Sequence, residues 1–433
     1  MKETADASPI RAVILPVGIT ADPVVFTIQT LRPEYLGLIG TRQSQQTMDT
    51  VFERVSFAPH RVKHVTVEDS PERIGQLVNH VYDLYHWLRF EKQLDPHEIA
   101  IDPTPGRKWM SAGATMVASH LGLPMFYVDV RFVNGKPDPD SMRMVRLGNA
   151  YDQTGFLLAD RGRELFNRTH FAGATEAYER IRPSRAQEAD FFAGMAILSK
   201  TLHRWDLFEH YQTSLRADFQ DALDRLRRHA VSATVGGEFH TFVDEVERLA
   251  DVVEELSRAP RPSLLAVADL VQNARRKILQ GHYDDAVARL YRAFEAIAQF
   301  YLKTEFAIDA SQPNWSSRSP SIRDAVRRAC GQLPSKIANV HGWNILRELK
   351  HPSAAHVFHR RKDGQWRMKL EGLLNDRNSS ILAHGWQPIS ARRAERMLER
   401  ISKLLDQIES DEIGRWVSRM QVPHLPDPVA RRE

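Results

Sequence analysis

The sequence has little cysteine, no long apolar run and almost no excess of charge. Its single cysteine, Cys330, excludes an internal disulfide framework and any zinc site built from several cysteines, and it fits a reducing cytosol. No stretch approaches the ~20 apolar residues of a membrane-spanning helix, and Met1 to Ser8 contain acids but no secretory signal. We therefore expect a soluble, cytoplasmic protein.

The charge balance and the missing motifs exclude several simple assignments. The chain has 59 Lys and Arg against 55 Asp and Glu, and a net charge of +4 is too small to indicate nucleic-acid binding by itself. A local basic run, His359 to Lys362, is a stronger hint, although such runs are usually solvated surface. The sequence contains no Walker loop, dinucleotide fingerprint or convincing metal-binding cluster. Its 433 residues suffice for about two or three domains with proper cores.

The first 150 residues alternate between short apolar runs and helical segments. The runs that read as strands are Ala12 to Val17, Tyr35 to Gly40, Val62 to Val67, Ile99 to Ile101 and Pro124 to Phe132. Helix starts are indicated by Asp22-Pro23 and Ser70-Pro71. Asn134-Gly135 predicts a turn, after which Met142 to Leu147 returns antiparallel. The alternation predicts a mainly parallel sheet covered by helices, ending near Gly148.

The turn after the fourth strand carries the most informative side chains of this half. Thr104, Gly106, Arg107 and Lys108 connect that strand to the following helix. In an open parallel sheet, ligands bind beyond the carboxyl ends of the strands, where helix N-termini offer free N–H groups to anions. Gly106 allows close backbone approach, the two cations suit phosphate, and Thr104 can hydrogen-bond. A phosphate-bearing ligand is the natural interpretation, and a well-capped turn with incidental basic residues is the alternative.

From Leu157 onward almost every segment has helical periodicity. We interpret the stretch before Pro260 to Pro262 as a helical spacer, and no repeat of about 34 residues indicates a tetratricopeptide array. Ala394 to Ile408 carries apolar residues at helical spacing, for core packing or a dimer face. The proline-rich, basic tail from Pro423 is expected to be flexible.

The segment from Leu373 to Gly385 holds the candidate catalytic side chains. If it is helical, Arg377 and His384 lie two turns apart on one face, separated by about 10 Å along the axis. A guanidinium suits a phosphodiester whose charge grows in the transition state, and an imidazole can move a proton near neutral pH. RNA brings its own nucleophile in the 2′-hydroxyl, so no metal is required. The alternative is a solvated arginine and a histidine that interacts with the helix dipole.

Two motifs in this sequence resemble known families. Arg377-Asn378 followed by Ala383-His384-Gly385 resembles the signature of HEPN ribonucleases, an arginine and a polar residue with a histidine after four to six intervening positions. The pattern Asp102-x-Thr-x-Gly-x-Lys-x-Met resembles CARF domains, the Rossmann-like sensors of cyclic oligoadenylates in type III CRISPR systems. Pro105 stands where that family usually has a second glycine, which stiffens the loop. The pairing of the two motifs resembles the CARF-HEPN ribonucleases.

The resemblance implies an α/β Rossmann-like N-terminal domain followed by an all-α half. It divides the chain into a CARF-like sensor at 1–150, a helical linker at 151–262 and a HEPN-like ribonuclease domain at 263–433. Each sensor would bind one symmetric cyclic oligoadenylate on a twofold axis through Gly18, Thr20, Gly40, Thr41, Thr104, Gly106, Arg107 and Lys108. The activator would be the only small molecule required, with no metal and no other cofactor.

The implied activity is metal-independent cleavage of single-stranded RNA by a homodimer in antiviral defence. Arg377 would hold the scissile phosphate, Asn378 would position phosphate or ribose, and His384 would handle the proton or orient the 2′-hydroxyl. Arg292 and Glu295 on an earlier helix would support this site or form a surface pair. CARF-like domains in related proteins can also degrade their activator.

Two other classes of function stay open from the sequence. One is a non-catalytic nucleotide-sensing adaptor that recruits a partner through its helical half. The other is a DNA-directed nuclease, which would normally need clustered carboxylates for metal ions.

Overall fold

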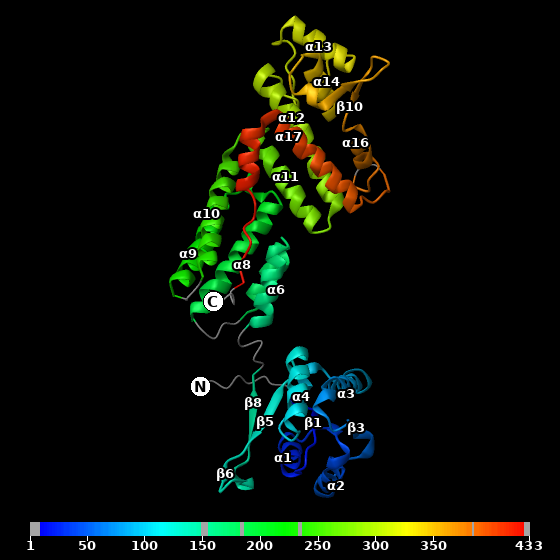
Figure 1. Ribbon diagram of the computed structural model, residues 1–433, viewed down its shortest axis with the longest axis vertical. Coiled ribbons are helices and arrows are strands. Elements are labelled where there is room, and N and C mark those ends of the chain that lie inside the picture. Colours follow the sequence, from blue (N-terminus) through cyan, green and yellow to red (C-terminus); the bar gives the residue numbers. More distant parts are fainter. Residues whose placement is uncertain (1–8, 149–154, 182–185, 233–235, 383–384, 428–433) are drawn as a thin grey trace. The chain divides into compact units, whose positions relative to one another are not determined.

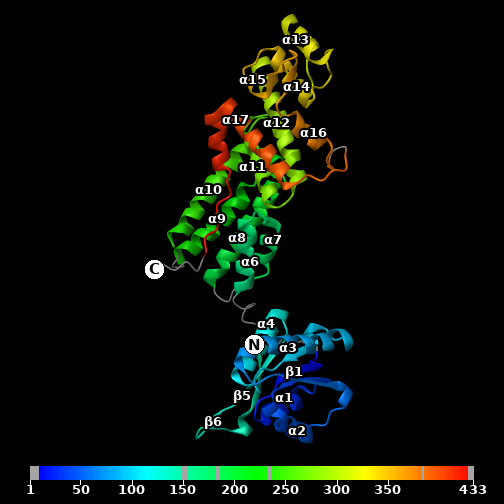
Figure 2. The same ribbon diagram turned by 45° about the vertical axis from the view of Figure 1, so that its right-hand side comes forward.

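The chain forms two compact units. The computed structural model describes residues 9–148, 155–181, 186–232, 236–382 and 385–427. The two units, Met1–Phe156 and Leu157–Glu433, are seen in Figure 1 and, turned, in Figure 2. Within the described ranges, no helix is both long and apolar enough to cross a membrane.

The N-terminal unit is built on a six-stranded sheet with the strand order β3-β2-β1-β4-β5-β8. The first five of these pair in parallel and β8 returns antiparallel to β5. The strands are β1 Ala12–Pro16, β2 Tyr35–Gly40, β3 Val62–Thr66, β4 Ile99–Ile101, β5 Met125–Asp129 and β8 Arg143–Leu147. This order reverses beside β1, as in Rossmann-like sheets. The predicted parallel sheet with an antiparallel last strand is confirmed.

Helices cover both faces of this sheet because its central strands are apolar on both sides. Ala12 and Ile14 belong to one core, whereas Val13 and Leu15 belong to the other, since successive side chains of a strand point to opposite faces. The first face is covered by α3 Ile74–His86 and α4 Lys108–Leu121, and the second by α1 Asp22–Leu31 and α2 Gln45–Arg54. A short hairpin of β6 Phe132–Val133 and β7 Lys136–Pro137 closes through the predicted Asn134-Gly135 turn, where both residues have positive φ.

The second unit is almost entirely helical, as predicted. Its α-helices are α6 Phe156–Asn167, α7 Phe171–Glu179, α8 Ala186–Asp206, α9 Arg216–Ser232, α10 Gly237–Arg258, α11 Leu264–Leu279, α12 Tyr283–Phe306, α13 Pro320–Cys330, α14 Asn339–Glu348, α15 Ala354–Val357, α16 Glu371–Asn378 and α17 Ala391–Arg419. One small hairpin, β9 Phe358–Arg360 with β10 Trp366–Met368, interrupts them. The predicted spacer and nuclease regions meet in the connection between α10 and α11.

One continuous apolar core runs through this helical unit, from Phe166 in α6 to Leu425 near the end of the chain. Leu425 is 1% exposed, and its backbone N–H donates to Asn167 Oδ1 while its carbonyl accepts from Asn167 Nδ2. The expectation of a flexible tail from Pro423 is therefore wrong as far as Asp427, because an apolar side chain and a paired amide hold this segment. The division at residue 262 remains a prediction, since the same core continues on both sides of it.

A buried polar network joins α8 to α11 inside the helical unit. Asp206 accepts hydrogen bonds from Asn273 and Arg276, and Lys277 also donates to it. Burial pushes the pKa of Asp206 upward, but the charges of Arg276 and Lys277 outweigh it and the pKa is lowered. Nearby, Asp269 accepts from Trp205 Nε1 at 3.0 Å. Replacing one partner of such a network leaves a buried charge uncompensated, which is strongly destabilising.

We predict that the titrations of His210 and Asp269 have opposite effects on the free energy of unfolding. Nε2 of His210 lies 3.5 Å from Oδ2 of Asp269. Burial lowers the pKa of His210 from 6.5 to about 4 and raises the pKa of Asp269 from 3.8 to about 7. At pH 5 the folded state therefore keeps one proton on Asp269, while the unfolded state keeps one on His210. Because both states bind one proton, this pair adds no pH dependence to the free energy of unfolding.

Replacing either residue alone is expected to make the stability of the folded chain depend on pH. Asp269→Asn leaves the lowered pKa of His210, so stability should rise by about 3 kcal/mol between pH 4 and 6.5. His210→Gln leaves the raised pKa of Asp269, so stability should fall by about 4 kcal/mol between pH 4 and 7. Urea unfolding at several pH values measures both slopes. Parallel profiles for the wild type and the two variants would contradict this interpretation.

Candidate active site and ligand crevice

The eight candidate ligand residues lie in three loops at one edge of the sheet. Gly18 and Thr20 follow β1, Gly40 and Thr41 end or follow β2, and the rest lie between β4 and α4. These strands are neighbours in the order β2-β1-β4, and they run parallel, so their carboxyl ends meet at the same edge. The helices that follow β1 and β4 pack on opposite faces of the sheet. This is the topological switch point at which open α/β sheets bind ligands.

The loops after β1 and β4 touch closely enough to require glycine. A Cβ built on Gly18 would lie 2.4 Å from the carbonyl oxygen of Pro105, and one on Gly106 would lie 2.7 Å from Cβ of Pro16. Both separations are shorter than any van der Waals contact, so the two glycines allow the loops to pack against each other. The close packing of these two loops therefore depends on Gly18 and Gly106.

Gly18→Ala is expected to destabilise the chain by about 1–3 kcal/mol, because the new methyl group overlaps a backbone carbonyl that cannot rotate away. The midpoint of chemical unfolding measures this loss. Gly75→Ala on α3 is the matched control, since its Cβ would meet nothing within 4 Å and alanine is the better helix former. Equal stability of the two variants would show that the loops are not locked together.

Asp102 holds the loop between β4 and α4 in place through its carboxylate. It is fully buried, and its two carboxylate oxygens accept hydrogen bonds from Thr27 Oγ1 at 2.5 Å and Thr104 Oγ1 at 2.6 Å. Burial raises the pKa of Asp102, while the two threonine hydroxyls act in the opposite direction. Thr104 Oγ1 also accepts from the N–H of Val128, at 2.8 Å. The Thr104 hydroxyl is thus engaged within the protein, and Thr104 shapes the loop.

The two basic residues of this loop differ in their partners. Arg107 forms an ion pair with Asp69, which lies beyond the end of β3. Lys108 is the exposed first residue of α4 and has no ion pair in the described part of the chain. Helix α4 also starts without a side-chain cap at Arg107, and the first N–H groups of a helix have no partner within the helix itself. A lysine at a helix N-terminus is an arrangement that favours anions.

Gly40 and Thr41 pack against the short helix Arg42–Ser44. Thr41 is 3% exposed, and its backbone N–H donates to Ser44 Oγ at 2.8 Å. A Cβ on Gly40 would lie 2.8 Å from Ser44 Oγ. Thr20, in contrast, is exposed next to Ile19, so it can meet a ligand directly.

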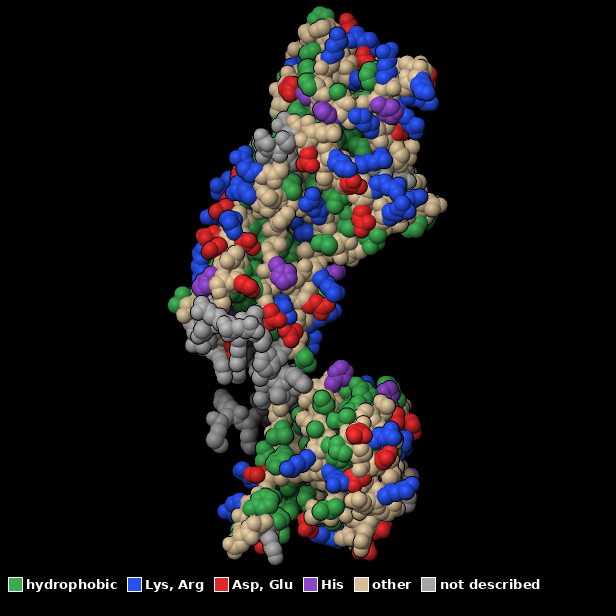
Figure 3. Space-filling model, viewed as in Figure 1, with side chains coloured by type: hydrophobic (Ala, Val, Ile, Leu, Met, Phe, Trp, Pro, Cys, Tyr) green, Lys and Arg blue, Asp and Glu red, His purple; other side chains and the backbone are tan. Residues whose placement is uncertain are grey.

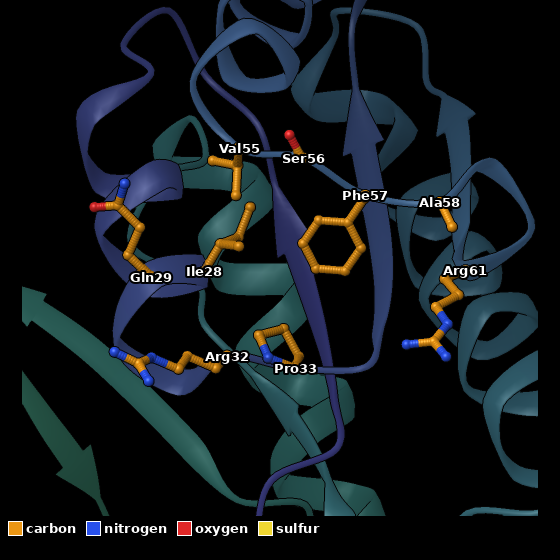
Figure 4. A pocket seen from close by; sticks show the side chains of 9 residues that line it. All are labelled: Ile28, Gln29, Arg32, Pro33, Val55, Ser56, Phe57, Ala58 and Arg61. Atoms are coloured by element: carbon orange, nitrogen blue, oxygen red, sulfur yellow. The ribbon is translucent and has the colours of Figure 1, made fainter.

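A separate hollow of about 560 Å³ lies at the opposite edge of the sheet, where β2 and β3 begin. Figure 4 shows the ring of Phe57 near the middle of this hollow, with the side chains of Arg32 and Arg61 on either side. None of the eight candidate residues lines this hollow. Its exposed arginines, Arg32 and Arg61, lie at the amino ends of the strands, so they can serve as controls for cations at the carboxyl ends.

Arg377 lies in the last turn of α16, held by an aromatic ring. Its guanidinium sits 4.5 Å from the ring centroid of Tyr291 on α12, and its Nη1 donates to Oδ1 of Asn378 at 3.2 Å. A guanidinium stacked on a ring keeps its planar fork free for phosphate oxygens. The two adjacent motif residues Arg377 and Asn378 therefore contact each other, and the Tyr291 ring supports the guanidinium.

The predicted single helix through Arg377 and His384 is wrong. Helix α16 ends at Asn378, and the chain then turns, with the N–H of Gln387 donating to the carbonyl of Ser379. The physical reason is the run Asn378-Ser379-Ser380, whose short side chains compete for backbone partners. Ser379 Oγ donates to the carbonyl of Asn375 at 3.1 Å. His384, the predicted proton-handling residue, lies outside the described residues.

The segment that follows α16 exposes large apolar side chains. Ile381 and Leu382 are each 57% exposed and Trp386 is 87% exposed. Arg292 and Glu295 form the predicted i, i+3 pair at 2.8 Å on α12. Figure 3 shows one face of the molecule, on which Lys and Arg side chains are scattered over the helical unit among fewer acids. No cluster of three or more metal-ligating side chains occurs in the described part of the chain.

Three supporting residues could not be found from the motifs. Thr27 on α1 donates a hydrogen bond to the buried Asp102, 75 positions away. Asp69 forms an ion pair with Arg107. The ring of Tyr291 lies against the Arg377 guanidinium. Each is brought to its partner by the tertiary fold. The only signal in the sequence was the isolated polar Thr27 on the otherwise apolar face of α1.

Comparison with known proteins finds one family model that is similar to part of the helical unit. Residues 245–408, which include Tyr291 and Arg377, match a family model described as the Csm6 HEPN domain. No curated protein matches the chain significantly. This match, with the Rossmann-like fold of the first unit, confirms the resemblance to CARF-HEPN proteins.

Two solved structures are similar over long stretches. Enterococcus italicus Csm6 bound to cyclic hexa-2′-fluoro-hexa-dAMP aligns with 94% of this chain and 98% of its own, at 10% identity and a TM-score of 0.49. Can2 from Sulfobacillus thermosulfidooxidans in complex with cyclic tetra-adenylate aligns with 70% of this chain and 70% of its own, at 14% identity and a TM-score of 0.24.

Proposed function

We propose that this chain is a cyclic oligoadenylate-activated, metal-independent endoribonuclease that cleaves single-stranded RNA in the cytoplasm, in type III CRISPR antiviral defence. The observation that carries the proposal is the guanidinium of Arg377, stacked on Tyr291 inside the segment that matches the Csm6 HEPN domain. A partly exposed guanidinium beside an amide is suited to bind a phosphodiester and to stabilise the charge that it gains during transesterification.

In the proposed reaction, the 2′-oxygen of the RNA attacks the adjacent phosphorus and the bond from phosphorus to the 5′-oxygen breaks. The 2′-hydroxyl proton leaves to a base, and the departing 5′-oxygen takes up a proton. Arg377 binds the phosphate oxygens, Asn378 orients phosphate or ribose, and His384 handles a proton or orients the 2′-hydroxyl. The products are a 2′,3′-cyclic phosphate and a 5′-hydroxyl.

A homodimer is part of the proposal. The loop after Arg377 exposes Ile381, Leu382 and Trp386, which is apolar surface of the kind that becomes buried between subunits. A second copy across this loop would bring two Arg377 side chains to one strand of RNA. The same twofold axis would let one symmetric ring contact both sensor domains.

The activator is proposed to bind in the crevice at the carboxyl ends of β1 and β4. Lys108 and the uncapped start of α4 offer positive charge and N–H donors to a phosphate of the ring. Binding activates the nuclease only if the ring has higher affinity for the active arrangement of the chain.

Analysis of the RNA termini tests the proposed chemistry. Cleavage in EDTA that yields 2′,3′-cyclic phosphate and 5′-hydroxyl ends, identified by mass spectrometry, is the expected result. Cleavage that needs Mg²⁺ and leaves 5′-phosphate ends would indicate a metal-dependent nuclease. Ring binding without any cleavage would instead indicate an adaptor.

A further inference from the structure

An elongated hollow runs along one side of α12, and neither Arg377 nor any of the eight candidate ligand residues lines it. Its two adjoining parts have volumes of about 490 and 350 Å³, and both are lined by Arg261, Pro262 and Arg292. We call it the arginine groove and define it by Phe208, Tyr211, Arg261, Arg292, Lys303 and Lys336. The connection between α10 and α11 forms one wall, and α12 forms the other.

The arginine groove carries more positive charge than its acids neutralise. Arg292 pairs with Glu295 at 2.8 Å, and Lys303 lies 3.9 Å from Asp309. Arg261 and Lys336 form no ion pair with any residue that the structure describes. A groove with unpaired cations attracts a polyanion, whereas a neutral helix or a second basic surface would leave these charges unmatched.

Two aromatic rings lie at the apolar end of the groove. Phe208 and Tyr211 are parallel within 2°, with ring centroids 6.1 Å apart, and the Arg261 guanidinium lies 4.6 Å from the centre of the Tyr211 ring. Phe208 adopts a left-handed backbone conformation with φ of 62°, in the turn that follows the end of α8 at Asp206. Rings beside cations bind unstacked bases and phosphates together.

The groove lies on the helix that also supports the candidate active site. Helix α12 carries Arg292 in the groove and, one residue earlier, Tyr291 beneath Arg377. From Arg289 to Lys303, the groove follows the helix for about 21 Å. We infer that the arginine groove binds single-stranded RNA, taking its phosphates on the cations and its bases on Phe208 and Tyr211, and so extends the substrate site away from Arg377. This inference rests on the proposed function.

The binding test uses the full chain with Arg377→Ala, so that RNA is bound without being cut. Fluorescence anisotropy with a labelled 20-nucleotide single-stranded RNA measures the affinity at several salt concentrations. Arg261→Ala with Lys336→Ala should weaken binding about tenfold and reduce the slope of log affinity against log salt by about 1.4, for two lost phosphate contacts. Phe208→Leu should weaken binding about tenfold without changing that slope.

Arg216→Ala with Arg248→Ala is the matched control, because it removes two exposed arginines of α9 and α10. It should leave both affinity and slope unchanged. Equal losses in the control and groove variants, or wild-type binding by the groove variants, would overturn the inference. A change in dimer dissociation alone, measured by analytical ultracentrifugation, would identify a subunit interface instead.

The failure of the proposed function can be distinguished from the failure of this inference. If no ring activates cleavage while the groove variants still lose RNA binding, the proposed function fails and the groove assignment stands. A single-stranded DNA of the same sequence then tests whether the groove prefers RNA.

Discussion

Arg377→Ala is expected to lower the rate of RNA cleavage by about 100- to 1,000-fold, because it removes the positive charge that faces the phosphate in the transition state. The guanidinium is partly exposed and its main contacts are the Tyr291 ring and the Asn378 amide, so the folded chain should keep its unfolding midpoint. Single-turnover cleavage of a fluorophore-quencher RNA, with activator saturating, measures the effect. Ring binding should be unchanged.

One further variant separates charge from geometry at this position, and a variant elsewhere serves as its control. Arg377→Lys keeps the charge but loses the planar fork that stacks on Tyr291, so its rate should fall between those of the wild type and Arg377→Ala. Arg327→Ala is the control, since Arg327 is another exposed helical arginine, paired with Asp324 at 2.8 Å on α13. Cleavage by Arg377→Ala within twofold of the control would remove Arg377 from the reaction.

Lys108→Ala is expected to weaken binding of the cyclic oligoadenylate by about 10- to 100-fold, because a charge-assisted contact to phosphate is lost. Lys108 is exposed at the start of α4, so the stability of the chain should not change. Isothermal titration with the ring gives the affinity, and the ring concentration for half-maximal RNA cleavage should rise by the same factor. The maximal rate at saturating ring should stay near that of the wild type.

Arg61→Ala provides the matched control for Lys108→Ala. Arg61 is an exposed cation of the same unit, but it lines the hollow at the opposite edge of the sheet, shown in Figure 4. Unchanged affinity in Arg61→Ala together with a loss in Lys108→Ala would support the crevice. The reverse pattern would move the ligand site to the other edge.

The sheet and its ligand edge could be predicted because their signals are local. Apolar runs such as Ala12 to Pro16 are buried on both faces, as is typical of parallel strands that helices cover on both sides. The loops that follow parallel strands lie at the same edge of the sheet. The sequence therefore predicts that Gly18 and Lys108 lie at one edge, without any knowledge of side-chain contacts. What could not be predicted is that Thr104 and Arg107 are engaged by Asp102 and Asp69.

The candidate active site was less predictable because its helix ends early. The apolar pair Ile381 and Leu382 favoured a continued helix, but both side chains are exposed and provide no packing that would hold one. Asn378-Ser379-Ser380 has low helix propensity, so the chain turns after Asn378. The partner of Arg377 proved to be Tyr291, 86 positions earlier in the sequence, which no short motif could reveal.

The most direct test of the proposed function is cleavage of single-stranded RNA in EDTA, with cyclic tri-, tetra- and hexa-adenylate added separately. The proposal predicts that one ring activates the wild type, that the same ring fails to activate Arg377→Ala, and that Lys108→Ala needs more of it. Tight binding of a ring without cleavage of RNA by the wild type would contradict the proposal, and the helical half would then act by recruiting a partner.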